Sequence, residues 1–258
     1  MNMPCPNQPS RHAVLLVHGL WMSGWIMQGL RLRLSRRGYA AYTFAYRSIA
    51  QNLDEHARRL AARIRQLPEP AIHLVGHSLG GLVILRCLRN HGEQRIARVV
   101  LVGTPVRACM AGQRLENLAG GKRLLGASRD IWRSLPEVFR PRCELGVIAG
   151  SRPWGLGRML MRLPGTNDGV VRLEETEAAG MRDRVVLPLS HSGMLVSAQV
   201  ARQVAAFLER GAFDHGDRGA FDDEGRGAFD QGGRGAFGHG NRGALEHQIR
   251  DRSGRAAR

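Results

Sequence analysis

The chain has 258 residues, 43% of them hydrophobic, and carries a formal net charge of +16. This length can bury one large hydrophobic core but excludes two ordinary domains. A strong positive charge favours nucleic-acid or anionic-membrane partners, but Lys122 is the only lysine beside 37 arginines. The codon usage of a GC-rich genome produces such a bias, so nucleic acid is not an expected partner.

Residues 12–209 alternate between short apolar runs and amphipathic stretches, which is the pattern of an α/β fold with a parallel sheet covered by helices on both faces. The expected strands are 13–17, 40–45, 72–75, 99–102, 145–149 and 184–187. Expected helices cover 53–67, with Asn52 as the N-cap and Pro68 after the end, then about 79–90 and about 197–208. Residues 1–11 form an N-terminal extension.

The connection from residue 104 to residue 142 is too long for a plain link between a strand and a helix. It is therefore expected to contain a small helical cap, inserted into the domain. Such insertions often lie over active sites. Four glycines within it favour a loose loop, although glycine-rich surface loops are common without any gating role.

The four cysteines are widely spaced and form no CxxC pair, which predicts reduced thiols in apolar surroundings: Cys5, Cys87, Cys109 and Cys143. Residues 1–11 hold three prolines and no apolar segment of the kind that a secretion signal needs, and no later stretch reaches the length of a membrane span. We therefore expect a cytoplasmic protein.

Ser78 stands in a Gly-x-Ser-x-Gly motif, directly after an apolar strand and directly before an amphipathic helix. That context predicts a nucleophile elbow, in which the chain turns sharply and Gly76 and Gly80 remove Cβ atoms that would clash. His77 is the residue before the serine. The helix start adds a dipole and N–H groups that favour developing negative charge. Ser78 is therefore the predicted nucleophile.

With these features, residues 12–209 resemble the α/β-hydrolase superfamily, in particular its small lipases and carboxylesterases. In that family a His-Gly pair follows the central strand, and His18 and Gly19 follow the expected strand 13–17. The resemblance implies that the N–H groups of Leu20 and Leu79 form the oxyanion hole. It also implies the sheet order 4-3-5-6-7-8 in the family's strand names, without the two leading strands, and neither metal nor organic cofactor.

The same resemblance sets the chain order serine, acid, histidine, with the last two on loops that follow strands. His91 lies at the far end of the helix that starts at the elbow, and the histidines after residue 209 fall in a repeat region: His215, His239 and His247. His191, which follows the expected strand 184–187, remains as the catalytic base. Its alternative is a structural histidine.

For the acid, Asp168 lies in an Asn-Asp-Gly-Val-Val segment that resembles the family's acid loop. Asp168 would hold the imidazole of His191 in the required tautomer. The alternative is a tight turn without catalytic duty, since Asn-Asp-Gly suits such turns. The rival carboxylates are Glu174, Glu175 and Asp183.

From residue 210 onward an eight-residue unit recurs, beginning Arg-Gly-Ala-Phe at 210, 218, 226 and 234 and Arg-Gly-Ala-Leu at 242. Units this short, rich in glycine and charge, cannot bury enough apolar surface to offset their ordering entropy. We expect residues 210–258 to form a disordered tail, and truncation after Glu209 to leave stability and activity unchanged.

The expected function is a serine hydrolase that cleaves a carboxylic ester, with a small-molecule ester or lipid as substrate. An acyltransferase, a thioesterase or an amidase would use the same residues, and a non-enzymatic binding protein of this fold is the alternative from another class. Residues 154–163 mix large apolar residues with arginine. Packing against the domain is the favoured interpretation, and weak contact with a membrane surface is the other. The sequence does not indicate an oligomeric state.

Overall fold

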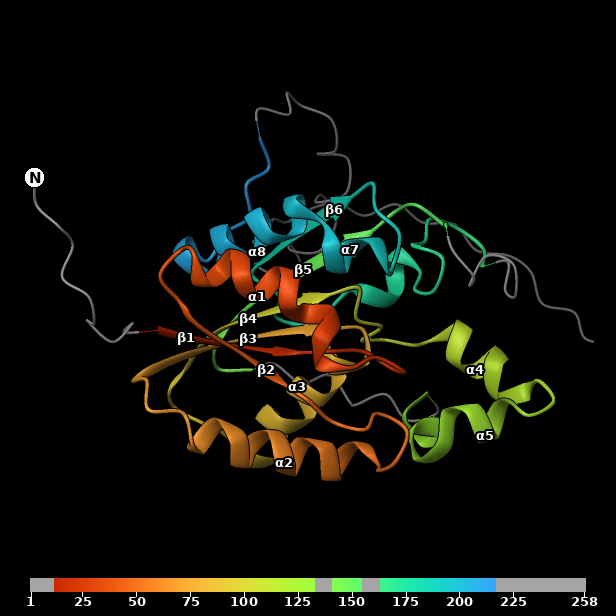
Figure 1. Ribbon diagram of the computed structural model, residues 1–258. Coiled ribbons are helices and arrows are strands. Elements are labelled where there is room, and N and C mark those ends of the chain that lie inside the picture. Colours follow the sequence, from red (N-terminus) through yellow and green to blue (C-terminus); the bar gives the residue numbers. More distant parts are fainter. Residues whose placement is uncertain (1–11, 133–140, 155–162, 217–258) are drawn as a thin grey trace, which may run out of the picture. The chain divides into compact units, whose positions relative to one another are not determined.

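A six-stranded sheet, parallel throughout, forms the centre of the computed structural model, which describes residues 12–132, 141–154 and 163–216 (Figure 1). Its order is β2-β1-β3-β4-β5-β6. The strands are β1 (His12–Val17), β2 (Ala40–Phe44), β3 (Ala71–His77), β4 (Ile96–Val102), β5 (Glu144–Gly150) and β6 (Asp183–Leu187). All six expected strands are confirmed, and their order is the one that the family resemblance implies.

Helices cover both faces of this sheet (Figure 1). On one face lie α2 (Leu53–Arg65) and α3 (Leu79–His91), and on the other lie α1 (Gln28–Ser35), α7 (Gly193–Val196) and α8 (Ala198–Arg210). The described residues also contain three short 3-10 helices: η1 (Gly24–Met27), η2 (Gly126–Trp132) and η3 (Leu173–Thr176). The expected α/β fold, with a parallel sheet covered by helices on both faces, is therefore confirmed.

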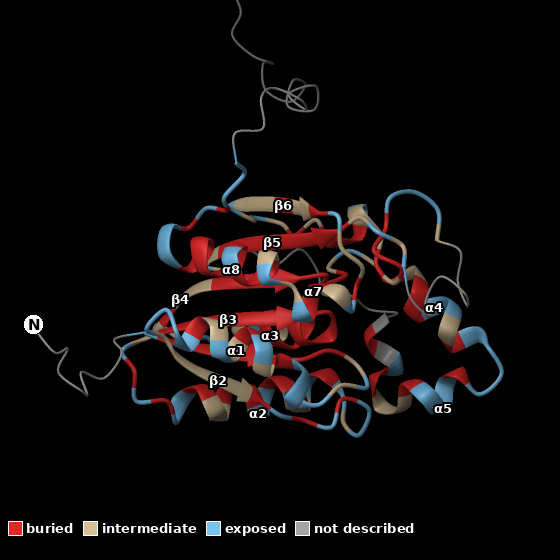
Figure 2. Cartoon of the chain, turned by 45° about the horizontal axis from the view of Figure 1, so that its top comes forward, coloured by how far each residue is buried: buried red, intermediate tan, exposed pale blue. Residues whose placement is uncertain are grey.

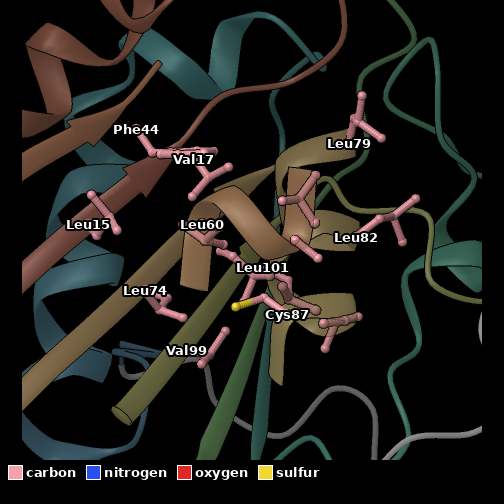
Figure 3. Close-up of a cluster of buried hydrophobic side chains, with 14 of the residues drawn as sticks. Leu15, Val17, Phe44, Leu60, Leu74, Leu79, Leu82, Cys87, Val99 and Leu101 are labelled. Carbon is pink, nitrogen blue, oxygen red and sulfur yellow. The ribbon is translucent and has the colours of Figure 1, made fainter. Parts of the chain in front are cut away.

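The central strands are largely apolar on both faces, because each has a helix layer on both sides. Along β1, Leu15 and Val17 join the core beneath α2 and α3, while Val14 and Leu16 join the core beneath α1 and α8. Figure 3 shows the first of these cores, and Figure 2 shows the central strands coloured as buried. Alternate side chains thus fill two separate cores, which fixes the strand register.

Helix α2 begins where its cap was expected. The side-chain oxygen of Asn52 accepts a hydrogen bond from the backbone N–H of Glu55 at 2.9 Å. Acidic residues in the first turn and arginines in the last complement the helix dipole. The predicted N-cap is confirmed, and the helix ends at Arg65, two residues before the predicted end.

The connection after β4 forms a helical cap over the carboxyl ends of the strands, as expected (Figure 1). It contains α4 (Met110–Asn117) and α5 (Gly121–Leu125), followed by η2. The N–H of Ala127 donates to the carbonyl of Ile49 at 3.0 Å, which ties this connection to the loop after β2. Residues 133–140 of the expected insertion lie outside the described residues.

The expected start of a disordered tail at residue 210 is too early. Helix α8 closes at Gly211, which adopts the left-handed conformation, and the next residues pack back onto the domain. Phe213 is only 5% exposed, its ring centre lies 4.9 Å from that of Phe207, and its N–H donates to Asp183. The first repeat unit thus completes the core beneath α8, and residues 217–258 lie outside the described residues.

Of the cysteines, Cys87 and Cys109 are buried free thiols, and Cys143 is a half-buried free thiol. Burial raises the pKa of the Cys109 thiol to about 12, so it stays protonated near neutral pH. Cys5 lies outside the described residues. Within the ranges that the structure describes, no helix is long and apolar enough to cross a membrane.

Candidate active site

Ser78 lies at the sharp turn between β3 and α3, at the carboxyl end of the sheet. Its backbone has φ 53° and ψ −123°, a conformation that side-chain-bearing residues rarely adopt. The N–H of Ser78 donates to the carbonyl of Val102 at 2.9 Å, which anchors the turn to β4. A strained serine at the junction of strand and helix is the geometry of a nucleophile elbow.

The motif glycines are required by close backbone approaches. A Cβ atom on Gly80 would lie 2.2 Å from the carbonyl oxygen of Val17, and one on Gly76 would lie 2.6 Å from the Cα of Gly81. Only glycine at both positions lets α3 start this close to β1 and to its own strand. The helix N-terminus therefore lies directly behind Ser78, where its dipole favours negative charge.

Asp168 and His191 are brought together although 23 residues separate them in the chain. The Nδ1 of His191 lies 2.8 Å from the Oδ2 of Asp168, and both side chains are buried. A carboxylate oxygen only accepts, so in the neutral imidazole this contact favours the tautomer with the proton on Nδ1 and the lone pair on Nε2. In addition, the N–H of His191 donates to the carbonyl of Asp168 at 2.9 Å.

The loop around Asp168 fixes the carboxylate through its second oxygen. Oδ1 accepts hydrogen bonds from the N–H groups of Val170 at 2.9 Å and Val171 at 2.7 Å. Asp168 thus forms the tight turn of the alternative interpretation, and its other oxygen faces His191. Turn and histidine contact use different oxygens of one side chain and do not exclude each other.

His77 links the elbow to the histidine loop, a contact that the sequence pattern did not predict. Its Nε2–H donates to the carbonyl of His191 at 3.0 Å, and the two imidazole rings lie 4.6 Å apart. Burial lowers the pKa of His77 well below the usual value, so the ring is neutral. His77 precedes Ser78, so this contact ties the turn that carries the candidate nucleophile to the loop that carries His191.

The loop after β1, which carries His18, Gly19 and Leu20, also lies next to Ser78. The Nδ1–H of His18 donates to the carbonyl of Gly19 at 2.9 Å, and the hydroxyl of Tyr46 donates to the carbonyl of His18 at 2.8 Å. A Cβ on Gly19 would lie 3.1 Å from the Cβ of Ser78. Leu20, the next residue, is therefore held close to the elbow.

Leu79 opens α3 immediately after Ser78 and is fully buried. The first N–H groups of a helix have no partner within the helix. Together with the loop that holds Leu20, this brings both residues of the expected oxyanion pair to the neighbourhood of Ser78.

The rival carboxylates have other partners. Glu175 is buried and accepts hydrogen bonds from the N–H groups of Met110 and Arg172, at 2.8 and 2.9 Å. Glu174 pairs with Arg172, and Asp183 accepts the N–H of Phe213. Each of these acids holds a loop or a helix in place, and His191 pairs with Asp168.

Within the ranges that the structure describes, no group of three or more His, Cys, Asp or Glu side chains is arranged as metal ligands would be. The site brings together a hydroxyl at a strained turn, an imidazole oriented by a carboxylate, and the N–H groups of a helix N-terminus. These groups are suited to nucleophilic catalysis.

The sequence of residues 14–226 matches the family model described as the alpha/beta hydrolase family. The chain belongs to this family. Among curated protein sequences, none matches the chain at a significant level. The match spans every strand after the first residues of β1, and so includes the elbow and both loops of the candidate site.

Solved structures of the alpha/beta hydrolase fold superpose on this chain at low sequence identity. The mature lipase BlEst2 of Bacillus licheniformis has a TM-score of 0.61 at 17% identity, covering 78% of this chain and 92% of its own. The esterase EaEST of Exiguobacterium antarcticum has a TM-score of 0.58 at 16% identity, with coverages of 77% and 92%. The metagenomic carboxyl esterase MGS0156 has a TM-score of 0.58 at 18% identity, with coverages of 74% and 68%. At such identities the likeness shows a shared fold.

Proposed function

We propose that this protein hydrolyses carboxylic esters through Ser78 as nucleophile, His191 as base and Asp168 as the acid that orients it. The observation that carries the proposal is the 2.8 Å contact between His191 Nδ1 and Asp168 Oδ2, on a loop tied by His77 to the elbow of Ser78. The names of the structural neighbours, a lipase and two esterases, support the ester as the substrate class.

In the first half of the reaction, Nε2 of His191 takes the proton of the Ser78 hydroxyl as the oxygen attacks the ester carbonyl carbon. The carbonyl oxygen becomes an oxyanion, which the N–H groups of Leu20 and Leu79 stabilise. The bond to the alcohol oxygen then breaks, and the imidazolium gives its proton to the leaving alcohol. Asp168 stabilises the imidazolium throughout.

In the second half, water attacks the acyl group on Ser78 while His191 takes one of its protons. The tetrahedral oxyanion forms again at the same position. Collapse of this species breaks the bond to Ser78, whose oxygen regains a proton from His191, and the carboxylic acid leaves. The enzyme returns to its starting protonation state without a cofactor.

The test compares wild-type protein with Ser78→Ala on p-nitrophenyl esters of increasing acyl length and with a labelled fluorophosphonate. Ser192→Ala is the matched control, because Ser192 is exposed, adjoins His191 and forms no side-chain cap bond to α7. We expect Ser78→Ala to lose hydrolysis and labelling while Ser192→Ala keeps both. Near-wild-type turnover by Ser78→Ala would contradict the proposal.

The same assay separates hydrolysis from acyl transfer to another acceptor. Transfer to an added alcohol would require water to be kept from the acyl-enzyme. Product analysis in the presence of the alcohol therefore reports the fraction of acyl groups released as free acid. We expect free acid to dominate, and a dominant transesterified product would identify an acyltransferase with the same three residues.

A further inference from the structure

The loops that follow the strands all gather at one edge of the molecule. Because the sheet is parallel, the segments after β1, β2, β4, β5 and β6 emerge at the carboxyl edge, beside Ser78. We call residues 20–27, 45–51, 110–125, 151–154 and 190–197 the rim. Hydrogen bonds join parts of it: Trp21 donates its indole N–H to Leu124 and its backbone N–H to Ser48, each at 2.9 Å.

Eight of the nine large apolar side chains that are exposed in the described residues lie on the rim. They are Trp21, Trp25, Ile26, Ile49, Leu118, Leu124, Trp154 and Val196, with Trp25 being 83% exposed. The ninth, Leu32, lies outside the rim on α1. Single exposed apolar residues are ordinary on protein surfaces, but a concentration around one edge marks an interaction surface.

A groove of about 550 Å³ runs through this surface. Its lining includes the apolar side chains of Trp21, Ile49 and Leu124 and the basic side chain of Arg123. Trp21 follows Leu20, the residue proposed for the oxyanion hole, and is held with φ 56°, in the left-handed region. A bulky aromatic residue rarely adopts this conformation, which presents the indole toward solvent at 56% exposure.

The charged residues of the rim are almost all basic. Its five segments carry Arg47, Arg114, Lys122, Arg123 and Arg152, all of them exposed, and one acid, Glu116, which is buried. The guanidinium of Arg152 lies 5.8 Å from the ring centre of Trp154, so that basic and aromatic groups are interleaved. Tryptophans among cations match the boundary between lipid headgroups and acyl chains on an anionic membrane.

We propose that the rim docks onto an anionic lipid surface and so delivers lipid esters to Ser78. This inference rests on the proposed function, because the rim lies around the site proposed for ester hydrolysis. Trp25 and Leu124 enter the acyl region of the lipid, and Lys122 and Arg123 contact the anionic headgroups. The orientation turns the carboxyl edge of the sheet, with Ser78, toward the membrane.

The test measures co-sedimentation of Ser78→Ala protein with vesicles of phosphatidylcholine alone and of phosphatidylcholine with phosphatidylglycerol in equal parts. Because this variant cannot consume lipid under the proposed mechanism, binding and catalysis are read separately. We expect binding to the mixed vesicles and little to phosphatidylcholine alone, with the bound fraction falling as salt is added. Trp25→Ser and Leu124→Ser should each lower the partition coefficient about tenfold, and Arg123→Glu should lower it by about the same factor.

Leu32→Ser on α1 and Arg36→Glu at the C-cap of α1 are the matched controls, since both residues are exposed and the changes are of the same chemical kind outside the rim. Both should bind as the parent does, and melting temperatures exclude unfolding in every variant. The proposal fails if the parent binds neither vesicle, if Leu32→Ser weakens binding as much as Trp25→Ser, or if Trp25→Ser instead dissociates a dimer of the free protein. Failure of the proposed function appears separately, as ester turnover that survives Ser78→Ala.

Discussion

At the scale of single residues, the two carboxylate oxygens of Asp168 have different partners. Oδ1 accepts hydrogen bonds from the backbone of its own turn, and Oδ2 contacts Nδ1 of His191. Asp168→Asn keeps the shape and the turn but replaces an acceptor facing Nδ1 with an amide, which favours the wrong imidazole tautomer. We expect kcat on a soluble ester to fall by about 10⁴ while the melting temperature changes little. Steady-state kinetics and a thermal melt check this.

Asp183→Asn is the control for that prediction, because the carboxylate of this rival acid contacts Arg184, Phe213 and His215 and not His191. It should keep wild-type kcat. If Asp183→Asn or Glu174→Gln lost activity and Asp168→Asn did not, the assignment of the acid would be wrong.

His77 is a positioning residue, since it reaches the proposed base through a backbone carbonyl. His77→Leu removes the N–H that holds the carbonyl of His191 and should lower kcat by about tenfold to a hundredfold, with KM little changed, because small displacements of a catalytic group are costly. His77→Gln retains an N–H donor and should recover part of the loss. A merely structural role would move the melting temperature of both variants and leave kcat of the folded enzyme unchanged.

At the scale of elements, the end of α8 depends on the first repeat unit. The N–H of Gly211 caps the helix on the carbonyl of Phe207, and Gln203 exchanges two hydrogen bonds with the backbone of Asp214. Removing Phe213 would leave an apolar cavity against Phe207. These contacts argue against the expectation that the chain is expendable after Glu209.

Truncation after Glu209 should lower the free energy of unfolding by about 3 kcal/mol, and Phe213→Ala by a similar amount. Truncation after Gly216 should change it little, because the composition of the remaining repeats predicts no packed core. Phe221→Ala makes the same change in the next repeat unit and is the matched control. Urea unfolding of the four variants measures these differences, and equal stability of the two truncations would contradict the packing of Phe213.

At the scale of the whole molecule, buried neutral histidines make stability depend on pH. Burial lowers the pKa of His73 to about 4 and that of His77 well below 6.5, and it lowers the pKa values of His18 and His56 in the same direction. Below pH 6.5 the unfolded chain binds protons that these folded rings exclude, so stability is complete above that pH and declines as the pH falls.

The free energy of unfolding should therefore fall with decreasing pH between 6.5 and about 4, by about 1.4 kcal/mol per pH unit for each fully buried ring such as His73 or His77. Urea titrations at about pH 7.5 and about pH 5 measure the difference. His73→Leu removes one of these rings, so it should reduce the change in the free energy of unfolding per pH unit by the contribution of one proton. A slope that is flat below pH 6.5, or unchanged by His73→Leu, would show that these rings accept protons in the folded state.

Local patterns were sufficient for the six strands and for helices α2, α3 and α8, whereas α1 and α7 were not predicted by range. Apolar runs of strand length, the cap at Asn52 and the glycines around Ser78 each depend on neighbours within a few residues, and the structure has the expected strands, cap and elbow. The strand order was predicted from the family resemblance. It agrees with the general rule that parallel connections have one handedness, which leaves few arrangements open.

The sequence by itself determined the fold, the elbow of Ser78 and a single histidine, His191, in the place that the family order requires. For the acid, the sequence predicted Asp168 but left three rivals open, and only the tertiary structure shows which carboxylate faces that histidine. It alone shows that His77 holds the loop of His191 and that Phe213 belongs to the core. It also decided that the exposed tryptophans surround one edge. The hydrogen bonds of Asp168, Trp21 and His77 join residues 23, 103 and 114 positions apart, so they depend on where whole strands end rather than on the neighbouring sequence.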